Sequence, residues 1–192
     1  MTRSSTLHKT VSSIKAATSR PTVYSIGHST RSIDAFISLL NAYGIDQVID
    51  VRTIPRSRHN PQFNKDVLAE SLKNAKIKYL HMPKLGGLRH ALRDSLNKAW
   101  MNASFRGFAD YMQTKEFESA LEKIVELSKH RKIVLMCAES VPWRCHRSLI
   151  GDALLVRKIQ TIDIFSKTTS KVHVLTPWAK IRGKKISYPD IS

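Results

Sequence analysis

Short apolar runs alternate with amphipathic stretches along most of this chain. The run Thr22–Gly27 predicts a strand that ends in a glycine turn. Apolar residues then recur at helical spacing up to Gly44, a residue type that commonly ends a helix: Ile33, Phe36, Ile37 and Leu40. The first part of the chain therefore predicts a strand followed by a helix.

The later segments continue this alternation. Further strands are predicted at Gln47–Val51, Lys76–Met82, Lys132–Cys137, Thr161–Phe165 and Lys171–Leu175. Helices are predicted after Asn64 (a candidate cap), over Phe105–Met112 and Phe117–Lys129, and after Pro142. Between them, Pro83–Ser104 predicts a long irregular loop. Repeated strand–helix alternation predicts a single α/β domain with a mainly parallel sheet flanked by helices, and ligands at the carboxyl ends of its strands.

The two ends of the chain differ from this middle part. Residues 1–20 are rich in Ser, Thr, Lys and Arg and contain no acidic residue, and they have no long apolar helical face that would favour a transit peptide. We therefore expect a disordered basic arm at 1–20, an α/β domain at 21–177 and a second basic tail at 178–192.

Charge and composition narrow the class of protein. The chain has 32 Lys and Arg against 15 Asp and Glu, a net charge of +17, which attracts phosphate polyanions and makes nucleotides or nucleic acid candidate partners. No apolar run approaches the roughly 20 residues that span a bilayer, so we expect no membrane association. Two cysteines are too few for a disulfide scaffold and fit a reducing compartment, so we expect a cytoplasmic protein.

Two strand exits carry polar residues suited to chemistry. After Gly27, His28 can act as an acid or base, and Ser29 can bind an anion together with main-chain N–H groups, although a simple capped turn explains the same residues. Arg52 follows the second strand and can grip a phosphate or carboxylate in bidentate fashion. Asp50 can instead be its buried partner.

The third exit is the richest in reactive groups. A buried strand delivers Cys137 and Glu139, and Cys145, His146 and Arg147 start the next helix. A thiol beside an arginine at a helix start has a lowered pKa, and Glu139 can serve as a general base or nucleophile. Two alternatives stay open, namely that the cysteines are purely structural, or that Glu139 and Arg147 form a buried ion pair.

Several known sites do not match this segment. A phosphatase loop has one residue fewer between its cysteine and arginine than Cys137 and Arg144 have. Phosphate-binding glycine loops and serine-nucleophile elbows are missing from the sequence. A metal site from Cys137, Cys145, His146 and His81 is conceivable, but no ligand spacing supports it, so no resident metal is expected and the cofactor is left unassigned.

The ordered set of motifs resembles one family over roughly residues 22–176. The pieces are Ser25–Ser29, Asp50–Arg52 with Pro55, Leu85–Gly87, Phe105–Tyr111, Cys137–Glu139 and Cys145–Arg147. They resemble the prokaryotic domain of unknown function 488. This resemblance implies a compact α/β domain in which these segments meet, and it brings no settled activity.

The leading hypothesis is an enzyme that acts on a phosphate-bearing or nucleotide-like substrate. Its candidate catalytic residues are Glu139, Cys137, Cys145 and His28, and its candidate ligand-binding residues are Ser29, Arg52, His146 and Arg147. The alternatives are a non-catalytic nucleic-acid-binding module and a cysteine-based redox or metal sensor.

Overall fold

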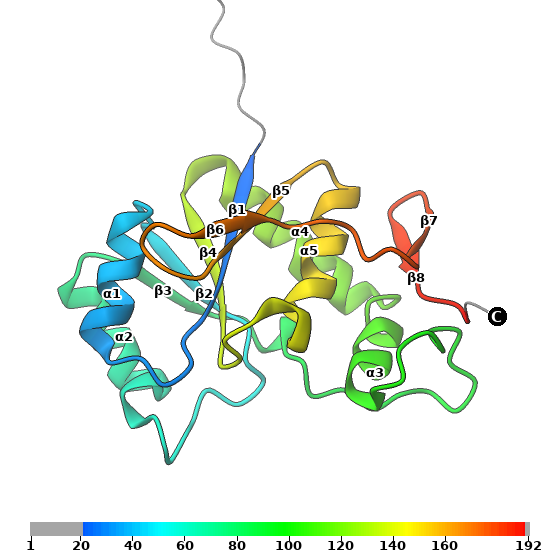
Figure 1. Ribbon diagram of the computed structural model, residues 1–192, viewed down its shortest axis with the longest axis horizontal. Helices are drawn as coiled ribbons and strands as arrows, with labels where there is room; N and C mark the ends of the chain where they lie inside the picture. Colours follow the sequence, from blue (N-terminus) through cyan, green and yellow to red (C-terminus); the bar gives the residue numbers. More distant parts are fainter. Residues whose placement is uncertain (1–20, 191–192) are drawn as a thin grey trace, which may run out of the picture.

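A six-stranded, mostly parallel sheet forms the centre of the molecule (Figure 1). The computed structural model describes residues 21–190, and the predicted basic arm at residues 1–20 lies outside this range. The strands are β1 (Thr22–Gly27), β2 (Gln47–Asp50), β3 (Lys78–His81), β4 (Ile133–Cys137), β5 (Gln160–Ile164) and β6 (Ser170–Val172). Their order is β3-β2-β4-β1-β5-β6, and β6 alone runs antiparallel to its neighbour. The predicted α/β single domain is confirmed.

Helices cover both faces of this sheet. They are α1 (Ile33–Ala42), α2 (Lys65–Asn74), α3 (Ala103–Tyr111), α4 (Lys115–His130) and α5 (Arg147–Val156). The α1–α2 pair lies on one side of the strands, and α4 and α5 lie on the other (Figure 1). This arrangement follows from parallel strands, whose crossover connections must return across a face of the sheet.

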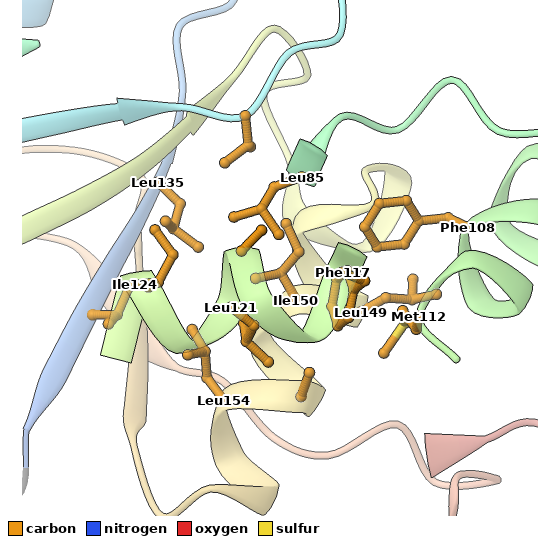
Figure 2. Packing of buried hydrophobic residues seen from close by; sticks show 14 of the residues in the cluster. Leu85, Phe108, Met112, Phe117, Leu121, Ile124, Leu135, Leu149, Ile150 and Leu154 are labelled. Atoms are coloured by element: carbon orange, nitrogen blue, oxygen red, sulfur yellow. The ribbon is translucent and has the colours of Figure 1, made fainter. Parts of the chain in front are cut away.

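Strand β4 shows why both faces need cover. Its side chains point alternately to opposite faces, so Ile133, Leu135 and Cys137 join one core while Val134 and Met136 join the other. Figure 2 shows Leu135 packed against leucines and isoleucines of α4 and α5. The nearly unbroken apolar run that predicted a doubly buried strand is explained by this position.

The helix starts mostly follow their expected caps. The Ser32 hydroxyl accepts from the N–H of Ala35 at the start of α1. Asn64 precedes α2 as predicted, but its side chain makes no cap hydrogen bond. Its Oδ1 instead accepts from the N–H of Ser57, because the preceding loop folds back over this helix start. The position predicted for the cap is therefore correct, but the predicted bond is not formed.

The long segment between β3 and α3 is irregular, as predicted, and Asp110 organises part of it. This buried carboxylate of α3 accepts from the Leu92 N–H, the Ser95 hydroxyl and the Asn97 amide. A carboxylate that receives several hydrogen bonds can fix a loop without regular secondary structure.

The segment after residue 177, expected from its composition to be a basic tail, contains regular structure. This segment forms a hairpin of β7 (Lys180–Arg182) and β8 (Lys185–Ser187), and Tyr188 beyond it is fully buried. The composition of the segment is basic, but Ile186 and Tyr188 point into the core beside α5. Burial of a few apolar side chains outweighs the charge of their neighbours.

A buried carboxylate of α5 ties this C-terminal segment down. Asp152 Oδ1 lies 2.8 Å from His173 Nε2 and accepts from the Thr176 N–H at 3.1 Å, and Asp152 Oδ2 accepts from the Tyr188 hydroxyl at 2.8 Å. Asp163 lies 3.8 Å from the other ring nitrogen of His173. A fully buried Asp152 therefore connects three points of the chain after β5.

None of the helices within residues 21–190 has the length and apolar character needed to cross a membrane.

We expect His173 to make stability depend on pH. Burial by itself lowers the pKa of His173, but the hydrogen bonds and charges of Asp152 and Asp163 outweigh burial and raise the pKa to about 9. A raised folded-state pKa stabilises the fold fully below the ordinary value near 6.5, and this contribution disappears as the pH rises through about 9. At about 1.4 kcal/mol per pKa unit, the contribution is at most roughly 3.5 kcal/mol.

Urea unfolding between about pH 6 and pH 10 measures this effect. The difference in unfolding free energy between the wild type and His173→Gln should be largest at the acidic end and should shrink toward pH 10. His130→Gln, at an exposed histidine of α4, is the matched control and should leave the profile unchanged. A wild type and a His173→Gln variant with parallel profiles would contradict the prediction.

Candidate functional site

The carboxyl ends of three parallel strands bring the predicted segments to one edge of the sheet. β1 leads into His28, β2 leads into Arg52, and β4 ends at Cys137. Main-chain hydrogen bonds continue past the strands, from His28 N–H to the Cys137 carbonyl at 2.9 Å and from Val51 N–H to the Met136 carbonyl at 3.0 Å. The segments that were expected to meet are therefore adjacent.

Side-chain alternation sorts the polar residues of these segments onto opposite faces. Cys137 lies in the core on the α4–α5 side, where it meets Cys145, whereas the His28 ring stacks on Phe63 in the core on the α1–α2 side. We call Cys137, Cys145, His146 and Arg147 the sulfur cluster. We call His28, Asp50, Arg52 and Tyr79 the arginine–aspartate cluster.

Cys145 is held just ahead of helix α5. A 3-10 turn over Pro142–Arg144 ends at Cys145, whose N–H donates to the Pro142 carbonyl at 2.9 Å. The helix itself begins at Arg147 with His146 before it, so Cys145 lies outside the first turn in which it was predicted. Its Sγ lies 3.4 Å from Arg147 Nε and 3.6 Å from His146 Nδ1.

The His146 ring has one defined orientation toward this sulfur. Its Nε2 lies 3.1 Å from the Val51 carbonyl, and a carbonyl can only accept, so Nε2 carries the proton of the neutral ring. Nδ1 then faces the Cys145 thiol, whose proton it can take. An imidazole held by a third group beside a thiol is the arrangement that activates cysteine nucleophiles.

Glycine at position 87 makes room for this imidazole. A Cβ on Gly87 would lie 2.4 Å from His146 Nδ1, and real Cβ atoms do not approach so closely. The neighbouring Gly86 instead packs on the main chain of Thr53. Gly87, which the sequence placed in an irregular loop, therefore forms part of the wall of the site.

Arg147 is a buried cation without a carboxylate partner. Its side chain is 2% exposed, and within residues 21–190 it forms no ion pair with Asp or Glu. Its guanidinium donates to Ser25 Oγ at 2.8 Å, to the main-chain carbonyl of Glu139 at 2.6 Å and to Cys145 Sγ. Because a buried charge needs compensation, the Cys145 sulfur is the group best placed to supply the negative charge.

The pKa values of the two thiols differ because Cys145 is in direct contact with both His146 and Arg147. A hydrogen bond from the Cys137 thiol, together with His146 and Arg147, holds the pKa of Cys145 well below its ordinary value despite burial. The hydrogen bond to Cys145 and burial raise the pKa of Cys137. The arrangement therefore favours a thiolate at Cys145 beside a neutral thiol at Cys137.

The side chains of the arginine–aspartate cluster form most of their hydrogen bonds with one another. Arg52 donates to both carboxylate oxygens of Asp50, at 2.9 and 2.6 Å, and to the Phe63 carbonyl at 2.8 Å. The Tyr79 hydroxyl donates to Asp50 at 2.7 Å. Asp50 is therefore the buried partner of Arg52, as the sequence allowed, and this geometry leaves Arg52 little capacity to bind an anion.

His28 is uncharged at neutral pH. Desolvation by burial lowers the pKa of His28 to about 4. Its Nδ1 donates to the Ser29 carbonyl at 2.8 Å, and its Nε2 faces Arg52 Nη1 at 3.3 Å, where only the arginine can donate. Both ring nitrogens are occupied, so the geometry favours a positioning role for His28 over the expected acid–base role.

The contacts of Arg147 favour neither the anion-binding role that we expected nor the ion pair with Glu139 that we considered. All three of its contacts are internal to the fold, and its contact with Glu139 is to the main chain, not to the carboxylate. Glu139 itself is exposed and forms no ion pair within residues 21–190. The buried Glu139–Arg147 ion pair considered from the sequence is therefore not formed.

Two adjoining cavities open beside the clusters. One, of about 280 Å³, is lined by both cysteines and His146, and by Ile54, Leu88, Phe105 and Arg144 among others. The second, of about 410 Å³, is lined by His28, Ser29, Arg56 and Asn60 among others. Arg52, Ile54, Ala138 and Glu139 line both, so together the cavities form one cleft with Glu139 between them.

Sequence reasoning missed several residues of this cleft. Ile54 and Leu88 contribute apolar walls, and no spacing along the chain associates them with Cys145. Phe105 also lines the cleft, and it belongs to one of the segments that the family resemblance expected to meet. The Gly86–Gly87 pair was a usable signal, since adjacent glycines often mark a close approach of main chain to another group. Ser25 belonged to the Ser25–Ser29 motif of the resemblance, but no role was predicted for it. Its hydroxyl accepts from Arg147 because it points to the same face as Cys137.

Three soft donors in this site lie close enough together to hold a metal ion. Cys137 Sγ, Cys145 Sγ and one His146 ring nitrogen all lie within 4.8 Å of one another. Sequence spacing gave no support for this group because the fold, and not the local chain, assembles it. His81 does not join it, since its Nε2 lies 2.9 Å from the Arg52 carbonyl. The adjacent Arg147 cation opposes a second positive charge, so the donor set alone does not select a metal role.

The fold and this site define an α/β protein with a thiol, an imidazole and a guanidinium at the carboxyl edge of a parallel sheet. The family model described as domain of unknown function DUF488 matches residues 32–154, and the chain belongs to this family. The matched range contains Arg52, Gly87 and the whole sulfur cluster, whereas the Ser25–Ser29 motif precedes it. Comparison with curated proteins and with solved structures finds no match.

We expect Cys145 to be alkylated at lower pH than Cys137. Iodoacetamide reacts with thiolates, so its rate at Cys145 should rise with a midpoint below the usual value near 8.5. Peptide mass spectrometry resolves the two cysteines, because trypsin cleaves between them at Arg144. Arg147→Lys should raise this midpoint, while Arg157→Met, a change at an arginine outside the cluster, should not. Equal rates at the two cysteines would contradict the assignment.

Gly87→Ala should mainly change the reactivity of Cys145, whereas Gly86→Ala should mainly change the stability of the fold. Alanine at 87 meets the movable His146 ring, so it should slow Cys145 alkylation at neutral pH with a small loss of stability. Alanine at 86 lies 2.8 Å from main-chain atoms of Thr53, so it should cost about 1–3 kcal/mol of unfolding free energy. Urea unfolding and alkylation rates test both variants, and unchanged alkylation in Gly87→Ala would show that the ring position does not matter.

Proposed function

We propose that this protein is an enzyme that uses Cys145 as a nucleophile on a small phosphate-bearing or nucleotide-like substrate. The single observation that carries this proposal is the position of Cys145 Sγ between His146 Nδ1 and Arg147 Nε, at 3.6 and 3.4 Å. One neighbour can take the thiol proton and the other stabilises the thiolate, which are the two means by which proteins activate cysteine.

The cleft supports a covalent step at its apolar end. The Cys145 thiolate attacks an electrophilic carbon or phosphorus of the substrate, a bond to sulfur forms, and the leaving group departs with a proton supplied from His146. Water or a second substrate then displaces the Cys145 thiolate, and His146 regains a proton from solvent. Glu139, exposed at the junction of the two cavities, is placed to accept the proton of that second nucleophile.

Two exposed arginines that line the cleft support recognition of phosphate. Arg56 lines one cavity and Arg144 the other, and within residues 21–190 neither forms an ion pair. Exposed, uncompensated guanidinium groups suit phosphate, whereas Arg52 and Arg147 are already bound internally. Phe105 at the apolar end offers a ring face to a flat group such as a nucleobase.

Trapping of a covalent adduct tests this proposal. The reduced protein is incubated with nucleoside mono-, di- and triphosphates and sugar phosphates, and intact-mass and peptide analysis locate any adduct. We expect an adduct on Cys145 that Cys145→Ser abolishes. Arg56→Met should lower the yield of this adduct about tenfold or more, because a hydrogen bond to a charged group is lost. Arg58→Met, on the same loop, is the matched control and should leave the yield unchanged.

Three outcomes would contradict the proposal. Turnover that persists in Cys145→Ser would exclude a nucleophilic role. Stoichiometric zinc or copper in the purified protein, lost in Cys145→Ser, would make this residue a metal ligand. Salt-sensitive duplex binding that Arg56→Met and Arg58→Met weaken equally, with no adduct on any substrate, would favour a nucleic-acid-binding module.

A further inference from the structure

A second thiol beside Cys145 takes no covalent part in the proposed nucleophilic mechanism. Cys137 ends strand β4, and its Sγ lies within 4.8 Å of Cys145 Sγ. Both sulfurs line the same cavity, and both side chains are nearly buried, with relative exposures of 9% for Cys137 and 3% for Cys145. A reactive sulfur is thus paired with a neighbouring thiol at the base of a small cavity.

The path of the chain favours this pairing. Strand alternation points Cys137 toward the α4–α5 side, and the segment Ala138–Arg144 turns back so that Cys145 arrives on the same side. The Glu139 carbonyl within this turn accepts from Arg147, which fixes the turn close to both sulfurs. Formation of a bond between the sulfurs therefore requires their separation to shorten from within 4.8 Å to about 2 Å.

We infer that Cys137 is a resolving cysteine that closes a reversible disulfide with Cys145 after a small hydroperoxide oxidises the Cys145 sulfur. This inference rests on the proposed function, because it uses the same reactive sulfur, and it adds a form of redox regulation to that site. Thiolate character and a nearby second thiol are the two features shared by reversibly oxidised cysteines.

The first step is a two-electron oxidation of Cys145. The thiolate attacks one oxygen of hydrogen peroxide, a sulfur–oxygen bond forms, and the oxygen–oxygen bond breaks. Hydroxide leaves and gains a proton from His146 or solvent to become water. The peroxide is reduced, and Cys145 becomes a sulfenic acid.

The second step consumes the sulfenic acid. The Cys137 sulfur gives up its proton, attacks the Cys145 sulfur and forms the disulfide, while the sulfur–oxygen bond breaks and hydroxide leaves with that proton as water. A dithiol reductant reverses the reaction by two thiol–disulfide exchanges and is itself oxidised to a disulfide. Closure therefore prevents irreversible oxidation to the sulfinic acid.

Formation of the disulfide would also remove the thiolate that compensates the positive charge of Arg147. The guanidinium would keep its bonds to Ser25 and to the Glu139 carbonyl but would lose its negatively charged neighbour. Uncompensated buried charge destabilises a fold, so the oxidised state should be inactive toward electrophiles and less stable around α5.

Peptide mapping of the full chain tests the inference directly. The reduced protein is treated with hydrogen peroxide, remaining thiols are blocked with N-ethylmaleimide, and trypsin digestion follows without reductant. We expect residues 133–144 and residues 145–147 to be joined by a disulfide, because cleavage after Arg144 separates the two cysteines. Dithiothreitol should restore both free peptides and the rate of Cys145 alkylation.

Two single variants assign the roles. In Cys137→Ser, Cys145 should accumulate a sulfenic acid that reacts with dimedone, and higher peroxide should drive it to the sulfinic acid. In Cys145→Ser, Cys137 should remain a free thiol under the same conditions. A near-isosteric serine disturbs the packing little, and Cys137→Ala serves as a second variant if the serine form does not fold.

The outcomes separate this inference from the proposed function. Rapid alkylation of Cys145 without any 133–144 to 145–147 crosslink, and with equal sulfinic acid in wild type and Cys137→Ser, would overturn the resolving role alone. Equal and slow alkylation of both cysteines would overturn the thiolate on which both proposals rest.

Discussion

The arrangement of this site depends on one buried cation, the Arg147 guanidinium. It lies at the start of helix α5, connects β1 through Ser25 with the turn after β4 through Glu139, and donates to Cys145. Removal of a guanidinium from water is costly unless a negative group compensates it. No carboxylate within residues 21–190 does so, and this constraint makes the charge of the Cys145 sulfur part of the structure as well as of the chemistry.

The parallel sheet divides the polar groups of its carboxyl edge into two clusters with different character. On the α1–α2 side, Arg52 and Asp50 satisfy each other, and His28 is neutral and held by both ring nitrogens. On the α4–α5 side, a cation without a carboxylate partner meets two thiols, and an imidazole nitrogen faces the Cys145 sulfur. The arginine–aspartate cluster therefore supports the edge of the cleft, whereas the sulfur cluster contains the groups suited to reaction.

The chain after β5 is held against the middle of helix α5 by a buried carboxylate. Asp152 is fully buried and receives bonds from His173, Thr176 and Tyr188. The same helix is thus anchored by a buried cation at its first residue and by a buried anion about one and a half turns further on. A helix fixed at both points keeps Cys145 and His146 in a defined position ahead of its first turn.

The sequence by itself determined the strands of the main sheet, the helices and their order, because these depend on local periodicity and on punctuating residues such as Gly44 and Pro142. It did not predict the C-terminal hairpin of β7 and β8. It also identified every member of the sulfur cluster, since His146 and Arg147 adjoin Cys145 and a buried strand ends at Cys137. It did not reveal that Tyr188 is buried, because a basic local composition hides two apolar contacts with a distant helix. Only the tertiary structure decided which partners each side chain meets. The face to which Cys137 and Asp50 point follows from strand register, and the approach of Gly87 to His146 and the lack of a carboxylate beside Arg147 arise from contacts between segments that are remote in the sequence.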